Sequence, residues 1–466
     1  MAQLVAREVW DFDAVGSNPA TPTKIAVLTA RKPQSSIALR FFIYRVLEFI
    51  MTENQNIPID QHYVPRSYLR NFSKIIGEGR KEKNHVCFFQ FSGEFYKENV
   101  PTKSICYKHY FYGEDGILEK SLSIQESQWS KVLKKSCQMQ RYDLDQNDES
   151  IIKKFAIYQF TRTLAFLNFT KDTAKDILAE CVKAHFNIPI DSNIEKLLVD
   201  KVNESVAPSM LINICNHILD DINDLKISIY KFQTTHKLIT SDAPIIITNP
   251  FSISSAGFAN IGIFIMFPVS TDTLVTIFDA KIYGNGSSFI VSSNEQDVIN
   301  LNKYQVISAE ERIISYNRND LEEVLKSDNA LNARKEYLSK DKLTVATDRV
   351  STMFGAKSRS LPYKFELSFG SLPKNLRKID SDCRGTYQRK YTEEAWIKSL
   401  IMIYRLPAML KNDPNFTDEE IEHRKKECSK MKTFLESYWD IPSNKRAITP
   451  ELMKKIQSAP MKFFKV

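Results

Sequence analysis

QHYVPRSYLRNF, residues 61–72, carries more potential functional side chains than any other stretch of the chain. It holds a histidine, two tyrosines, a proline and two arginines, which is too polar for a core strand and too aromatic for an ordinary loop. The Val64-Pro65 pair favours an extended or turn conformation, because the proline ring disfavours the helical region for the preceding residue. A helical turn after it would set Arg66 and Arg70 four residues apart on one face, with His62 beside them. We therefore expect the fold to start here.

The composition is that of a globular protein. The chain has 466 residues, 43% of them hydrophobic and 26% charged, which predicts roughly two or three domains with a buried core. Its seven cysteines are odd in number and scattered, with no CxxC pair, as expected of reduced thiols rather than of a disulfide framework. No apolar run approaches the roughly 20 residues that span a bilayer. We expect a soluble cytoplasmic protein without a membrane partner.

Positive charge is concentrated in the last third. Residues 331–466 contain 28 Lys and Arg against 17 Asp and Glu, whereas the remainder contains 36 against 39. Such asymmetry favours an acidic partner, nucleic acid first, although a solvated helical surface would also account for it. Protein partners cannot be inferred.

Residues 1–50 do not resemble the rest of the chain, and we expect a spurious or disordered leader. The segment VGSNPATPTK contains Gly-Ser-Asn-Pro, which in-frame translation of a tRNA T-arm would encode. Our hypothesis is that translation starts at Met51 and that the leader is read-through of a neighbouring tRNA gene. Such genes are insertion points for mobile elements, which hints at mobile-element or phage-defence cargo. A targeting leader is the rival hypothesis, but LRFFIYRVLEFIM has no small-residue cleavage site.

The patterning predicts an α+β fold. A β-rich run over 85–100, interrupted at Ser92-Gly93, is typical of a hairpin. Helical periodicity follows from 117 to 225, including one helix through 151–170. Strands return over 226–316. We expect a mixed sheet of the N-terminal hairpin and these strands, packed with the central helices, in a core domain of residues 51–317. A basic, mainly helical region of residues 318–466 completes the chain.

Five motifs in order resemble the domain of unknown function 4238 family, over residues 51–317. They are HYVPRSYLRNF, YFYGEDGILEKSLSIQE, Gln159-Phe-Thr-Arg162, Ser241-Asp242-Ala-Pro244 and Phe267-Pro268. The chain departs from the family pattern at Leu164, where proline would follow Arg-Thr, and this leaves the helix path open. The family has no established activity, so the resemblance implies a shared fold and site without a reaction.

Polar side chains recur in otherwise apolar segments, and one interpretation gathers them in a single cleft. Histidine suits general acid–base catalysis, arginines hold phosphate or carboxylate bidentately, and carboxylates could bind a divalent cation. The candidate catalytic residues are His62, Glu119, Glu126 and Asp242, and the candidate ligand-binding residues are Tyr63, Arg66, Arg70, Gln159 and Arg162.

The alternative interpretation is structural. An arginine paired with a helix glutamate can fasten an extended segment to a domain. Asp242 can form an Asx-turn, and Gln159 and Arg162 can satisfy buried carbonyls. The sequence has no P-loop, GxGxxG, HExxH or GxSxG motif, so no motif implies a cofactor or a metal.

Two functions therefore remain open, and the sequence does not decide whether the protein is an enzyme. The first is an enzyme acting on nucleic acid or nucleotide phosphodiesters, with residues 331–466 gripping the polymer. The second is a non-enzymatic binding or sensor module for a small anionic ligand or a protein partner.

Overall fold

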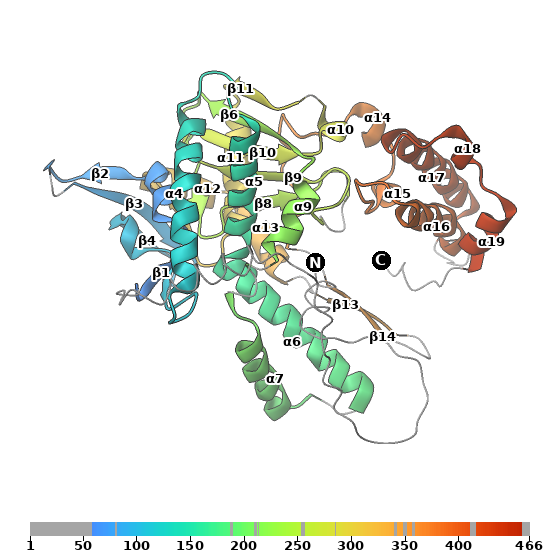
Figure 1. The fold of residues 1–466 in the computed structure, drawn as a ribbon, viewed down its shortest axis with the longest axis horizontal. Coiled ribbons are helices and arrows are strands. Elements are labelled where there is room, and N and C mark those ends of the chain that lie inside the picture. Colours follow the sequence, from blue (N-terminus) through green and yellow to red (C-terminus); the bar gives the residue numbers. More distant parts are fainter. Residues whose placement is uncertain are drawn as a thin grey trace, which may run out of the picture.

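The computed structural model describes residues 58–79, 82–186, 190–208, 212, 214–252, 257–284, 286–339, 343–347, 352–356, 359–410 and 416–458. The expected leader, residues 1–50, lies outside these ranges. The chain has the expected α+β architecture, with a helical C-terminal region beside the sheets (Figure 1). Within the described ranges, every helix is too short or too polar to cross a membrane.

The strands divide into two main sheets instead of one. The first has the order β11-β6-β10-β9-β8, with β11 and β6 parallel and the other neighbours antiparallel. Its strands are β6 (Lys226–Phe232), β8 (Ile246–Thr248), β9 (Phe264–Pro268), β10 (Thr273–Phe278) and β11 (Ser288–Ser292). A polar turn at Ser270–Asp272 joins β9 to β10.

The second sheet pairs strands from the start of the core region with a strand from its end. The predicted hairpin is present as β3 and β4, and β12 pairs with β3 on one side and β7 on the other. The strands of this sheet are β2 (Lys74–Ile76), β3 (Lys83–Gln90), β4 (Phe95–Pro101), β7 (Thr240–Ser241) and β12 (Arg312–Ser315). A separate two-stranded ladder pairs β1 (Asp60–His62) with β5 (Tyr107–His109).

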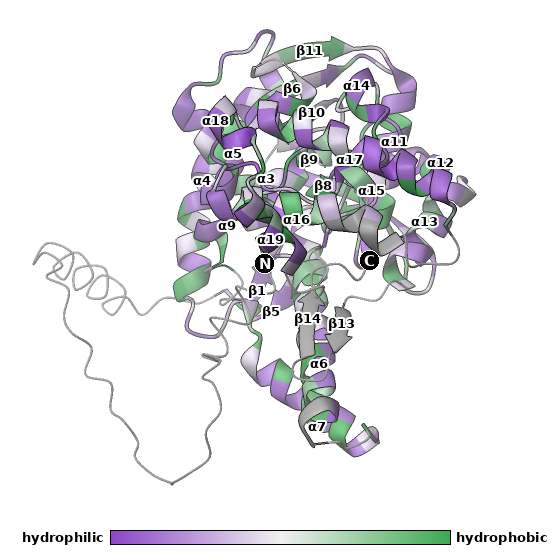
Figure 2. Ribbon diagram, turned by 90° about the vertical axis from the view of Figure 1, so that its right-hand side faces the viewer, coloured by the Kyte–Doolittle hydropathy of each residue, from purple (hydrophilic) through white to green (hydrophobic). Residues whose placement is uncertain are grey.

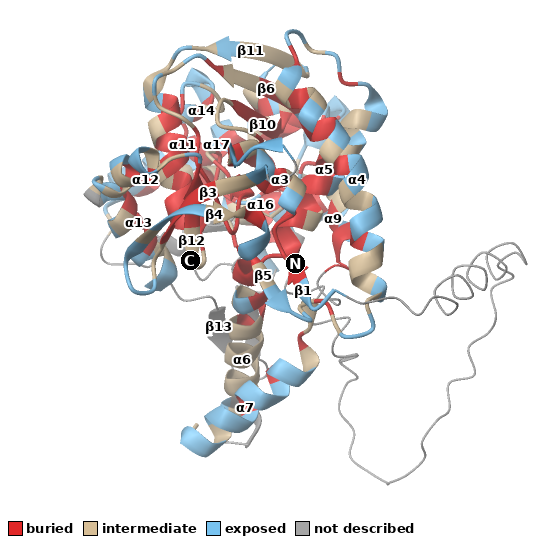
Figure 3. Cartoon of the chain, turned by 90° about the vertical axis from the view of Figure 1, so that its left-hand side faces the viewer, coloured by how far each residue is buried: buried red, intermediate tan, exposed pale blue. Residues whose placement is uncertain are grey.

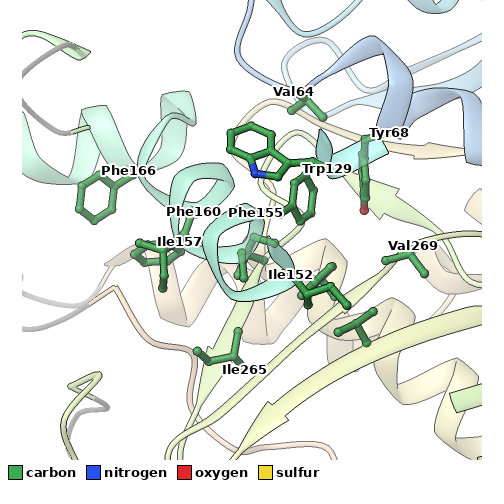
Figure 4. Packing of buried hydrophobic residues seen from close by; sticks show 14 of the residues in the cluster. Val64, Tyr68, Trp129, Ile152, Phe155, Ile157, Phe160, Phe166, Ile265 and Val269 are labelled. Atoms are coloured by element: carbon green, nitrogen blue, oxygen red, sulfur yellow. The ribbon is translucent and has the colours of Figure 1, made fainter. Parts of the chain in front are cut away.

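Helices cover both faces of the first sheet, as the alternation of side chains along β9 requires. Ile265 and Phe267 pack into the cluster formed with α4 and α5, where Trp129 and Phe155 meet (Figure 4). Phe264 and Met266 point to the opposite face, into a cluster with α11. The central strands are therefore buried on both sides. Figure 3 shows the buried residues gathered around the strands, α5 and α11, while α7 is largely exposed.

The helices of the core are α3 (Arg66–Leu69), α4 (Ile117–Gln138), α5 (Gln146–Thr161), α6 (Leu164–Phe186), α7 (Ser192–Ser205), α9 (Cys215–Ile222), α10 (Ala280–Tyr283), α11 (Glu295–Ser308), α12 (Arg318–Leu325) and α13 (Asp328–Ser339). Short 3-10 turns follow at Arg70–Phe72 and Thr102–Ser104. Helices α6 and α7 extend away from the sheets, and hydrophilic residues are prominent on outer helices such as α4 and α12 (Figure 2).

The single helix expected through residues 151–170 is two helices. Helix α5 ends at Thr161 and α6 begins at Leu164, so the helix is interrupted at the point where the family pattern has a proline. Thr163 lies between the two helices: its hydroxyl donates to the Phe160 carbonyl and accepts from the Phe166 amide at 3.3 Å. This is the N-cap bond that starts a helix.

The C-terminal region packs on the core. It contains a hairpin, β13 (Leu343–Thr347) with β14 (Thr352–Ala356), and the helices α14 (Lys374–Arg377), α15 (Ser381–Arg384), α16 (Glu393–Leu410), α17 (Asp418–Tyr438), α18 (Ser443–Arg446) and α19 (Pro450–Ser458). Buried Arg389 donates to the Phe258 and Asn260 carbonyls and to the Asp224 carboxylate. The domain boundary at residue 317 stays a prediction.

Tyr68 ties the opening stretch to both sheets. Its buried hydroxyl donates to the Pro268 carbonyl of β9 at 2.7 Å and lies 2.8 Å from the Thr240 hydroxyl of β7. These two strands belong to different sheets, so one side chain of α3 holds the junction between them.

Replacing Tyr68 by Phe should lower the free energy of unfolding by about 1–3 kcal/mol, because two buried polar groups lose their partner. Urea denaturation measures this. Tyr110→Phe is the matched control, since Tyr110 is exposed and its hydroxyl has no partner among the described residues; its effect should stay within about 0.5 kcal/mol. Equal stability of the two variants would contradict the role given to Tyr68.

Candidate functional site

Arg162 is the centre of the polar network. Its side chain is 1% exposed. Nε donates to the Tyr112 hydroxyl at 2.8 Å, and Nη2 donates to the His62 carbonyl at 2.6 Å and to Glu126 Oε1 at 2.7 Å. A guanidinium presents its donors in a fixed fork, so these bonds set the relative positions of β1, α4 and the loop before α4.

Gln159, about one turn before Arg162, also holds the opening stretch against α5. Its Nε2 donates to the Tyr63 carbonyl at 3.0 Å, so the carbonyls of His62 and Tyr63 both accept from α5. Gln61 adds a third clamp: its side chain donates to the Gly113 carbonyl at 2.9 Å and accepts from the Tyr112 amide at 2.5 Å. The opening stretch is thus held largely through its backbone.

Two buried polar atoms of this network have no partner in the described part of the chain: Arg162 Nη1 and Gln159 Oε1. A buried donor or acceptor left unpaired costs about 1–3 kcal/mol. The two side chains lie three residues apart, Gln159 on the last turn of α5 and Arg162 at its C-cap, one offering an acceptor and the other a donor. The site therefore holds more hydrogen-bonding capacity than the fold uses.

Glu119 differs from Glu126, although both lie on the same face of α4, seven residues apart. Glu126 is the ion-pair partner of Arg162. Glu119 is half-buried and has no hydrogen bond or ion pair to any described residue. Burial raises the pKa of Glu119 to about 7; the positive charge of Arg162 opposes this rise and the negative charge of Glu126 adds to it. Glu119 therefore titrates near neutral pH.

His62 is neutral at that pH. Its Nε2 lies 3.1 Å from the Lys103 carbonyl, and because a carbonyl only accepts, Nε2 carries the proton and Nδ1 is left as an acceptor. The pKa of His62 is lowered to about 4, chiefly by burial; the charges of Arg66 and Arg162 act in the same direction, and the Lys103 hydrogen bond opposes them. Such a histidine is a weak base.

Arg66 and Arg70 are both exposed. Arg66 lies close enough to His62 for its charge to lower the histidine pKa, so it borders the network. Arg70 contributes its carbonyl to the Ser73 amide and hydroxyl. Neither guanidinium has an ion-pair partner among the described residues.

Asp242 lies apart from this network. Its buried carboxylate accepts from the amides of Glu310 at 2.9 Å, Glu311 at 2.7 Å and Arg312 at 3.3 Å. Burial raises the pKa of Asp242 to about 6, and these amide bonds oppose the rise. The structural interpretation fits Asp242, but the bond of the local turn is made by the Ser241 hydroxyl, which accepts from Ala243.

Tyr63 connects the two regions. Its backbone carbonyl binds Gln159, whereas its buried ring lies near Cys106 and Asp242, and burial raises the pKa of its hydroxyl. The hydrogen-bonded network thus joins Tyr63 with His62, Glu126, Gln159 and Arg162. Glu119 and Arg66 border it through their charges, and Arg70 and Asp242 lie outside it. Sequence reasoning missed Gln61 and Tyr112 as members, although both stand in the quoted motifs.

The carboxylates predicted as cation ligands are not assembled. Asp242 faces backbone amides, and Glu126 faces Arg162. Across the ranges that the structure describes, no three His, Cys, Asp or Glu side chains are grouped so as to hold a metal ion.

The profile of the family described as Protein of unknown function (DUF4238) matches residues 60–319, more than half of the chain. The matched segment runs from the first residue of β1 into α12 and includes every member of the Arg162 network. No curated protein and no solved structure matches the chain.

Replacing Glu119 by Gln should stabilise the protein at alkaline pH. The folded pKa of about 7 lies above the unfolded value of 4.5, so the folded state binds the extra proton and its stability falls as pH rises from 4.5 through 7. The neutral amide removes this loss. Discounted for partial exposure, the advantage of the variant should grow by about 1–2 kcal/mol between pH 5 and pH 8.5.

Denaturant unfolding at the two pH values measures the change. Glu126→Gln is the control, because it removes the ion-pair partner of Arg162 and should destabilise the protein at both. A Glu119→Gln variant whose stability follows the wild type at every pH would contradict a raised pKa.

Proposed function

The protein belongs to the DUF4238 family of proteins of unknown function, and from that premise we propose that it is an enzyme acting on phosphodiesters, with Glu119 as its proton-transfer group. The observation that carries the proposal is a half-buried carboxylate with a pKa near 7 and no partner among the described residues. Proton transfer is most efficient when the pKa of the group lies near the operating pH. Strongly perturbed carboxylates also cluster at functional sites.

Arg162 supports Glu119 as a positioning residue. It is too deeply buried to touch a substrate, but three of its hydrogen bonds fix it in place. A fixed positive charge beside a site of proton transfer stabilises negative charge that develops there without any reorganisation. The exposed guanidinium of Arg66 is the group suited to hold a phosphate bidentately.

His62 takes a lesser part than its residue type suggests. A pKa of about 4 makes it a poor partner for proton transfer at neutral pH, and its Nδ1 is suited to accept a hydrogen bond from a ligand. We assign the proton transfer to Glu119 instead. Glu126 keeps Arg162 neutralised and is not assigned a chemical step.

The proposed step is hydrolysis. The Glu119 carboxylate takes a proton from an attacking water as the new O–P bond forms. The ester P–O bond then breaks, and protonated Glu119 returns the proton to the leaving oxygen. The products are a phosphomonoester and an alcohol, and Glu119 is regenerated.

A reducing, cytoplasmic location belongs to the same proposal. All seven cysteines lie in the described ranges and are free thiols, as is usual in reducing compartments. An origin as mobile-element or phage-defence cargo is supported only by the tRNA-like leader, so it stays a hypothesis.

A non-enzymatic module for a small anion is the second candidate. It is favoured by Arg162, whose bonds to His62, Tyr112 and Glu126 serve the fold itself. In that case the exposed guanidinium of Arg66 would recognise an anion without turnover.

Hydrolysis of bis(p-nitrophenyl) phosphate and of short oligonucleotides should separate the two. As an enzyme, the wild type turns over, and Glu119→Gln lowers kcat by about 100-fold or more while remaining folded. Glu114→Gln, an exposed change outside the network, should leave kcat unchanged. Full activity in Glu119→Gln would overturn the role of Glu119. A wild type that never turns over, yet is stabilised by inorganic phosphate, would establish the binding module.

A further inference from the structure

The surface at the C-terminal end of α4 is hollowed, far from the acidic N-terminal half of the same helix. The hollow has a volume of about 600 Å³, within the range of small-ligand sites. We call it the α4 hollow. Its lining residues are mostly basic side chains and amides: Lys131, Lys134, Lys135, Gln138, Met139, Gln140, Arg141 and Asp143.

Three of its cations are uncompensated. The only acid in the lining, Asp143, is already used, because Lys135 Nζ lies 3.0 Å from its Oδ1 and 2.8 Å from Asp148 Oδ2. Lys131, Lys134 and Arg141 are exposed and have no hydrogen-bond or ion-pair partner among the described residues. The hollow therefore presents a net positive charge carried by these three side chains.

This arrangement suits an anion better than water. Lys131 and Lys134 lie three residues apart on one helix, and like charges at that spacing repel by a few tenths of a kcal/mol. The negative end of the α4 dipole offsets part of this repulsion. Met139 also lines the hollow, but it is only 6% exposed, so the exposed part of the lining is polar and basic. Several unpaired cations on one surface match the successive phosphates of a polynucleotide strand.

We propose that the α4 hollow binds the phosphate backbone of a nucleic-acid strand, so that the substrate of the Glu119 site is a polynucleotide. The inference rests on the proposed function. Lys134 follows Glu119 by fifteen residues on α4, which places it about 22 Å further along the helix and roughly a sixth of a turn around it. With one phosphate per ~3.4 Å along a strand, about six or seven phosphates cover that rise.

The basic C-terminal region was the expected polymer grip, but several of its arginines serve the fold. Arg334 donates to the Val306 and Ala309 carbonyls, Arg359 to the Ser308 carbonyl, and Arg389 to the core carbonyls named above. All three are buried. Their guanidinium groups are engaged in hydrogen bonds within the protein and cannot contact a nucleic-acid strand, whereas the exposed cations of the α4 hollow can.

Fluorescence anisotropy with labelled single-stranded RNA and DNA of about 16 nucleotides tests the proposal. The test variant carries Lys131→Glu, Lys134→Glu and Arg141→Glu. The control carries Lys378→Glu, Lys426→Glu and Lys445→Glu, which are exposed C-terminal positions with the same change in net charge. The test variant should bind at least about tenfold more weakly, and the slope of log Kd against log salt should fall by about 2, or ~0.7 for each lost phosphate contact.

The outcomes separate this proposal from the previous one. If it holds, the test variant still hydrolyses bis(p-nitrophenyl) phosphate at the wild-type rate, and Glu119→Gln binds oligonucleotides normally. Equal weakening in both triple variants, or weakening in the control alone, would overturn the α4 hollow as the binding site. Binding to phosphatidylserine vesicles without binding to oligonucleotides would overturn nucleic acid as its ligand. Loss of hydrolysis in Glu119→Gln alone would leave the proposed function standing when the hollow fails.

Discussion

The structure depends on one buried cation. A guanidinium taken out of water must be neutralised and hydrogen-bonded, because leaving it unpaired costs several kcal/mol. Arg162 meets this demand with groups from three segments that are far apart in sequence: the His62 carbonyl, the Tyr112 hydroxyl and the Glu126 carboxylate. The requirement draws the opening stretch, the loop before α4 and α4 itself onto α5. The break after α5 then directs α6 away from this junction.

Burial in the same region also raises the pKa of Glu119. Glu119 lies on the face of α4 that approaches Arg162, but Glu126 takes the ion pair, so Glu119 is desolvated without direct compensation. A fold selected only for stability would place an amide or an apolar side chain there. Proteins usually retain such a cost where a group has work to do. The proposed function of Glu119 follows from this imbalance between two carboxylates on one helix face.

Much of the fold could be predicted, because local patterning carries it. The Ser92-Gly93 hairpin, the Ser270–Asp272 turn and the start of α17 all follow from residue types at fixed offsets. Thr417, the N-cap of α17, forms a capping box with Glu420. The choice of cap among similar neighbours could not be predicted in this way. Helix α5 is capped by Asp145 although Asn147 and Asp148 follow it, and α11 by Asn294 although Ser293 precedes it. The division of the strands into two sheets depends on pairings such as β12 with β3, which no local pattern encodes.

The sequence predicted which residues form the site better than it predicted the role of each residue. Residue type proposed His62 as the acid–base group, but its pKa is set by the depth of its burial, which depends on segments far away in sequence. Asp242 was grouped with the site because it is polar within an apolar run, yet its partners are amides about 70 residues further along the chain. Gln61 escaped notice because a glutamine next to a histidine and a tyrosine attracts no chemical interpretation. Long-range packing decided each of these cases.

The most direct test is a ¹³C NMR titration of the glutamate carboxyl groups, with the Glu119 resonance assigned by its absence from Glu119→Gln. A midpoint near pH 7 is the predicted result, because burial beside Glu126 disfavours the ionised form more than Arg162 restores it. A midpoint near the ordinary value of 4.5 would mean that Glu119 is solvated and ionised, and the account of this site would then be wrong.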